Sequence, residues 1–95
     1  MAAEDDIRRI SKIFEAIGNP IRLKILMLVN ETDRPLHIKA VAKTLKKDYA
    51  AVYRHIKILE KSGLIRIYEV GRSRVLHGRN AELTKQLTEM AKKLM

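Results

Sequence analysis

The chain has 95 residues, a formal net charge of +9 and no cysteine. This length indicates one domain, 1–95, and the lack of cysteine excludes disulfides and thiolate metal sites. No run of about eighteen apolar residues is present, and the segment MAAEDDIRRI begins acidic rather than basic and apolar, so we expect no membrane span, no secretory signal and a cytoplasmic location.

Two helices are expected before residue 31. Apolar residues recur at helical spacing from about Asp5 to Ile17, which predicts an amphipathic helix with an exposed polar face. Asn19 is a good N-cap, and Pro20 suits the first turn of a second helix, because its missing amide is not needed there. That helix, 20–30, is apolar nearly all round and should be the central buried element.

A third and a fourth helix follow at close spacing. Ile38 and Leu45 bound the apolar positions of the third helix, which the brief strand 36–38 could precede by pairing with the hairpin. Asp48 should cap the fourth helix, and Gly63 should end it in the left-handed conformation. Val52, Ile56 and Leu59 form its buried stripe, while Tyr53, Arg54 and Lys57 are expected to point away from the core.

The C-terminal third predicts a hairpin and a fifth helix. The β-branched run 64–70, a turn at 71–73 and a return at 74–76 are typical of a hairpin with two cations at its tip. Residues 80–95, capped by Asn80, carry an apolar seam like that of the first helix. We expect the two seams to form a two-fold homodimer interface, although both helices could instead cover their own core. The expected interface residues are Ile7, Ile10, Phe14, Ile17, Leu83, Leu87, Met90 and Leu94.

The positive charge lies in the middle of the chain. Residues 34–79 hold twelve Lys and Arg against three acidic residues, which accounts for the whole net charge of +9. Basic residues can simply make a small domain soluble, but surfaces usually mix both signs. Their confinement to one segment favours a polyanion-binding surface.

Two segments resemble a known family. AIGNPIRLKILMLV (16–29) resembles the signature second helix of ArsR-like winged helix-turn-helix transcription regulators, and VYRHIKILEKSGLI (52–65) resembles their DNA-reading helix. The resemblance implies a mainly α fold with a small β-hairpin wing and about five helices. It also implies dimerisation through terminal helices, here 1–18 and 80–95, and a DNA-binding helix-turn-helix and wing at 36–79.

The chain departs from this family in its candidate metal ligands. Metal-sensing members carry a Cys-x-Cys pair where this chain has His37 and Lys39, and others use Asp and His pairs on the last helix, which 80–95 lacks. A protonated lysine cannot bind a metal, so we expect no metal and no cofactor. The sequence leaves open whether the effector is a small molecule, a partner protein or absent. Lys46 also replaces the turn glycine that usually precedes the reading helix.

The interpretation assigns DNA contacts to two groups of residues. Base edges in the major groove are assigned to Tyr49, Ala50, Tyr53 and Arg54, with Arg54 as the candidate for a bidentate contact to guanine. Backbone phosphates are assigned to Lys43, Lys46, Lys47, His55, Lys57, Arg72, Ser73 and Arg74. Tyr53 could instead pack on the hairpin, Arg54 could pair with Glu60, and His55 could pack against the core.

The sequence therefore predicts a transcriptional regulator, expected to be a repressor, that binds a pseudo-palindromic duplex DNA site as a homodimer. A winged-helix protein-interaction module of a transcription or other assembly, and an RNA-binding domain, are the alternatives. An enzyme is not expected, because the chain has no cysteine nucleophile, no Gly-rich phosphate loop and no catalytic residue set.

Overall fold

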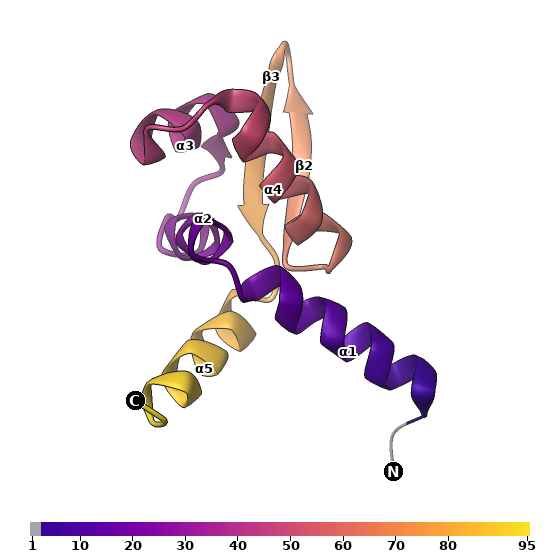
Figure 1. Ribbon diagram of the computed structural model, residues 1–95. Helices are drawn as coiled ribbons and strands as arrows, with labels where there is room; N and C mark the ends of the chain where they lie inside the picture. The colour runs from indigo at the N-terminus through magenta and orange to yellow at the C-terminus, as the bar shows by residue number, and fades with distance from the viewer. Residues whose placement is uncertain (1–2) are drawn as a thin grey trace.

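The computed structural model describes residues 3–95, which form five helices and a three-stranded antiparallel sheet (Figure 1). The fold is therefore the mainly α winged helix-turn-helix that the sequence predicts. The helices are α1 (Glu4–Ile17), α2 (Pro20–Asn30), α3 (Ile38–Leu45), α4 (Tyr49–Lys61) and α5 (Ala81–Lys92). The strands are β1 (Leu36–His37), β2 (Ile65–Val70) and β3 (Ser73–Gly78), in the sheet order β1-β3-β2.

Several element boundaries follow from local chemistry, as predicted. The Asn19 side chain accepts hydrogen bonds from the amides of Ile21 at 2.9 Å and Arg22 at 3.1 Å, so it caps α2, and Pro20 occupies the first turn. Gly63 has a φ of 80°, which only glycine adopts without cost, and the chain turns there after α4. The short strand before α3 also forms and pairs with β3.

Two predicted side-chain caps are wrong. Asp48 occupies the N-cap position of α4, but its carboxylate makes no capping hydrogen bond. Asn80 precedes α5 with a φ of 60°, and its amide donates to the carbonyl of Gly63 at 3.4 Å instead of capping the helix. The hairpin turn is also shorter than expected, since Ser73 already pairs with Val70 and only residues 71–72 form the loop.

The core lies between α2, α3, α4 and the sheet. Each of these elements contributes fully buried aliphatic side chains: Ile25, Leu26, Ile38, Val41, Val52, Ile56, Leu59, Ile65 and Leu76. Helix α2 contacts α1, α4 and β3 and is the central helix of this group. It is not buried all round, however, because Met27 is 41% exposed.

Helices α1 and α5 extend away from this core at the end opposite the wing tip (Figure 1). Each has one buried residue, Ala16 in α1 and Thr84 in α5. The apolar seams are largely exposed within the protomer: Ile7 48%, Ile10 47%, Phe14 57%, Leu83 57%, Met90 62% and Leu94 91%. Ile17 instead packs partly buried against the core of its own protomer, and Leu87 is half-buried.

Candidate nucleic-acid interface

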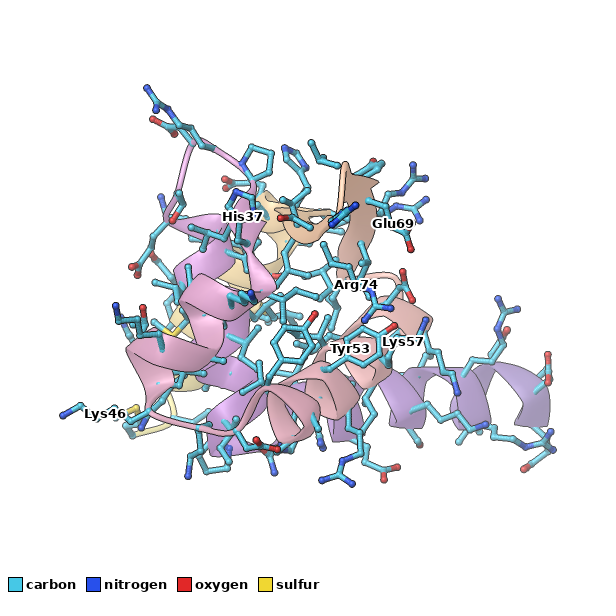
Figure 2. The ribbon with its side chains drawn as sticks, turned by 90° about the horizontal axis from the view of Figure 1, so that it is seen from above. His37, Lys46, Tyr53, Lys57, Glu69 and Arg74 are labelled. Carbon is cyan, nitrogen blue, oxygen red and sulfur yellow. The ribbon has the colours of Figure 1, made fainter. Side chains whose placement is uncertain are left out.

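One end of the molecule brings together α3, the start of α4 and the wing. Helix α3 packs against α4, and β1 joins the start of α3 to the hairpin through its pairing with β3, so these elements share one face. Figure 2 looks onto that face, with Lys46 at the turn between α3 and α4 and with His37, Tyr53 and Arg74 toward the wing. Lys46 has a φ of 55°, the left-handed conformation that glycine would adopt most easily.

Helix α4 presents a narrow exposed stripe. Ala50, Arg54, Ile58 and Lys61 are exposed and follow one another at four-, four- and three-residue steps, which places them on one side of the helix. Arg54 has no hydrogen-bond or ion-pair partner among residues 3–95. Its possible partner Glu60 instead pairs with Lys57 at 2.7 Å. The Arg54 guanidinium is therefore available to a ligand.

Two tyrosines of α4 lie beside this stripe and face the wing. The rings of Tyr49 and Tyr53 stack with centroids 6.3 Å apart and an interplanar angle of 12°. The guanidinium of Arg74 on β3 lies 4.8 Å from the centre of the Tyr53 ring, a cation–π geometry visible in Figure 2. The neighbouring Tyr49 hydroxyl raises the pKa of Arg74. Tyr53 thus packs on the hairpin, and the base contacts expected of both tyrosines remain predictions.

The remaining predicted phosphate contacts lie around the same face. Lys43, Lys46, Lys47, Arg72 and Ser73 are all exposed. A hollow of about 270 Å³ lies between the start of α3 and the wing, and its lining includes His37, Lys39 and Arg72. Sequence reasoning noted His37 and Lys39 where metal-sensing members of the ArsR-like family carry cysteines, but left them out of the residues assigned to DNA. Both residues lie in the basic segment 34–79, and this position could have indicated that they belong to the cationic face.

His55 lies on the flank of α4 away from the wing. Its Nδ1 is 3.1 Å from Nη1 of Arg22 in α2, a contact that sequence reasoning missed. Burial lowers the pKa of His55, and the nearby charges of Arg22, Arg54 and Lys47 lower it further. The imidazole is therefore held neutral by its surroundings.

Residues 3–95 contain no group of three His, Asp or Glu side chains placed to hold a metal ion. None of their helices is long and apolar enough to span a membrane.

Comparisons with known proteins agree with the fold. Residues 19–79 match the model of a protein family designated HVO_A0114. The chain belongs to the HVO_A0114 family. The family match runs from the cap of α2 to the end of β3, so it contains the helix-turn-helix and the wing and leaves out α1 and α5.

Relatives of this HVO_A0114 protein include an uncharacterized HTH-type transcriptional regulator of Methanocaldococcus jannaschii, MJ0229. It is 41% identical over 54 residues, which cover 57% of this chain and 55% of that protein, so the chain spans about half the length of this relative. A solved ArsR-family transcriptional regulator, RHA00566, is 26% identical with a TM-score of 0.73, over 99% of this chain and 93% of that chain.

The homodimeric winged helix-turn-helix DNA-binding domain Mb0332 of Mycobacterium bovis, described as a possible ArsR-family regulator, has the same fold. Its TM-score is 0.83 at 16% identity, over 97% of this chain and 89% of that chain. The resemblance of the HVO_A0114 chain to ArsR-like winged-helix regulators is therefore confirmed.

Proposed function

We propose that this protein is a transcriptional regulator that binds a specific duplex DNA site as a homodimer. The observation that carries the proposal is the exposed stripe of α4, with an unpaired Arg54 at its centre, inside a face of exposed lysines and arginines. A helix of this kind fits the major groove of B-form DNA, where a bidentate Arg–guanine contact selects sequence. The relatives described as HTH-type transcriptional regulators support the same function.

In this mode α4 enters the major groove with Ala50 and Arg54 toward the base edges. Lys43 in the last turn of α3, and Lys46 and Lys47 in the turn that precedes α4, contact phosphates on one side of the groove. Arg72 at the wing tip reaches the backbone or the adjacent minor groove. Tyr49 and Tyr53 line the wing side of the helix, and Tyr49 is its first residue.

A two-fold homodimer accounts for the exposed seams of α1 and α5. Each seam presents apolar side chains that are about half exposed or more, and a second copy of the same seams would cover them. The homodimeric description of Mb0332 supports this assembly. Two reading helices related by a two-fold axis bind half-sites about 34–36 Å apart, so the target site is pseudo-palindromic. Occupying such a site blocks other proteins from it, so repression is the simplest outcome.

The proposal is tested by selecting duplexes from a random pool and measuring their affinity with two matched variants. Arg54→Ala should reduce affinity for the selected duplex by roughly 5- to 150-fold, the equivalent of about 1–3 kcal/mol, and leave a scrambled duplex almost unaffected. Lys47→Ala should weaken both duplexes alike, because a phosphate contact reads no sequence. Equal losses from Arg54→Ala on both duplexes would show that Arg54 does not read bases. Tighter binding of RNA than of DNA at matched salt would contradict the proposed ligand.

A further inference from the structure

Arg22, from the NPIRLKIL segment of α2, contacts two other helices with one side chain. Its Nε donates to the carbonyl of Ala16 at 2.7 Å and its Nη2 to that of Glu15 at 3.2 Å, both in the last turn of α1. Its Nη1 lies 3.1 Å from Nδ1 of His55, in the middle of α4. One guanidinium therefore joins the end of α1 to the helix that carries Arg54.

This contact determines which nitrogen of His55 holds the proton. A guanidinium is always protonated and can only donate, so Nδ1 of His55 must accept. A neutral imidazole that accepts at Nδ1 carries its hydrogen on Nε2. The charges of Arg22, Arg54 and Lys47 near the ring, together with its burial, oppose a second proton. His55 is thus a neutral ring with an Nε2–H donor.

The Nε2–H group has no hydrogen-bond partner among residues 3–95 and reaches solvent. Among residues 3–95, the only buried side-chain nitrogen or oxygen atoms without a hydrogen-bond partner belong to Asn30, so Nε2 of His55 is not enclosed. The charged groups that influence the ring are all cations: Arg22 from α2, Lys47 from the turn before α4, and Arg54 from α4 itself. A donor in such surroundings suits an anionic oxygen. His55 adjoins Arg54 but lies half-buried on the flank of the helix, which places it at the side of a groove rather than at its floor.

We propose that Arg22 is a positioning residue that fixes the Nε2–H tautomer of His55, and that this Nε2–H donates one hydrogen bond to a DNA backbone phosphate beside the groove entered by α4. The inference rests on the proposed function, because it names a contact of the same DNA-binding face. Arg22 lies outside the basic segment 34–79, so the charge distribution alone gives it no role. In this inference it acts by orienting His55. Because the imidazole is neutral, its contact adds affinity without displacing a counterion from DNA.

The tautomer is tested first, in the protein free of DNA. Long-range ¹H–¹⁵N correlation spectra distinguish a protonated from an unprotonated imidazole nitrogen. We expect His55 to show a protonated Nε2 and an unprotonated Nδ1, and Arg22→Met, which keeps the aliphatic stem and removes the donors, to produce a mixture of tautomers. A protonated Nδ1 in the wild-type protein would overturn the inference whether or not the protein binds DNA.

The phosphate contact is tested with two substitutions at His55. Glutamine places an amide donor near the position of Nε2, whereas asparagine reaches only the position of Nδ1. With the selected duplex, His55→Asn should lose about tenfold in affinity or more, the usual effect of losing a hydrogen bond to a charged group, and His55→Gln should stay within about threefold of wild type. Neither should change the slope of log K against log salt, while Lys47→Ala should reduce its magnitude by about 0.9 for each protomer bound. The double variant Arg22→Met/His55→Asn should bind no more weakly than His55→Asn alone, because both changes remove the same contact.

The outcomes separate this inference from the function on which it rests. Selective DNA binding by the wild type with unchanged affinity in both His55 variants would overturn the phosphate contact alone. A changed salt slope in His55→Asn would show that the ring acts as a charge and would also overturn it. If the wild-type protein does not bind duplex DNA, the proposed function and the phosphate contact both fail, while the tautomer measurement still decides the role of Arg22. Thermal unfolding of each variant excludes loss of fold as the cause.

Discussion

Replacing Phe14 with glutamate should convert the proposed dimer into folded monomers. Phe14 is 57% exposed on the α1 seam, so the protomer does not need its ring for the core. In the proposed dimer the ring is covered by the partner, and a glutamate there would place a charge in an apolar contact. We therefore expect dissociation with little change in the stability of the isolated protomer.

The size of the effect follows from the exposed area of the ring. A phenylalanine side chain contributes roughly 200 Å², of which the exposed 57% is about 110 Å². At about 25 cal/mol for each Å² covered, two such rings contribute about 6 kcal/mol to the dimer if fully covered and about 3 kcal/mol if half covered. The dimer Kd should therefore rise by a factor between about 10² and 10⁴.

Sedimentation velocity over a concentration series measures this change directly. Val70→Glu is a matched control, because Val70 is 60% exposed but lies on the wing, far from both seams. It should leave the dimer Kd unchanged, and circular dichroism should show that both variants stay folded. A Phe14→Glu protein that sediments as a dimer at the same concentrations as wild type would refute the assignment of the interface to the α1 seam.

Two further predictions concern stability. The surroundings of His55 lower its folded-state pKa, so the contribution of the neutral ring is fully present above about pH 6.5, the ordinary histidine pKa, and is lost as the pH falls through the lower folded-state value. Urea unfolding should show this loss in the wild type and a smaller one in His55→Gln, and equal pH profiles would contradict it. Gly78→Ala should lower the free energy of unfolding by about 1–3 kcal/mol, because the new methyl group would overlap the Asn30 amide. Adding Asn30→Ala should remove most of that overlap penalty, and an additive loss in the double variant would exclude the overlap as its cause.

The sequence predicted the helix ends that depend only on residues adjacent in the chain. The start of α2 requires only the Asn19 side chain and the fixed φ of Pro20, and the end of α4 requires only a residue that tolerates a positive φ at 63. The caps at Asp48 and Asn80 were predicted by the same logic and are wrong. At Asn80 the left-handed backbone, imposed by the exit from β3, turns the side chain toward Gly63 and away from the first turn of α5.

The candidate site was harder to predict, because its decisive contacts join residues far apart in the chain. Tyr53 lies between the buried and exposed sides of α4, so its helical position alone does not determine whether it faces a ligand or the wing. The β2–β3 pairing places Arg74 over the Tyr53 ring, and this contact directs the ring toward the wing. Likewise, the segment that contains Arg22 was identified as a signature, but its partner His55 lies 33 residues away and on another helix.

These contacts change the expected salt dependence of DNA binding. Of the eight residues assigned to phosphates, six are cationic, and at about −0.9 per neutralised phosphate they would give a slope near −5 for each protomer. In the structure Lys57 pairs with Glu60 and Arg74 lies on the Tyr53 ring, which leaves the exposed group Lys43, Lys46, Lys47 and Arg72. Four such contacts give a slope near −4 for each protomer, or about −7 for a dimer on two half-sites, against about −11 from the sequence count. A measured slope close to −11 would mean that the side chains of Lys57 and Arg74 leave their partners and contact phosphates when DNA binds.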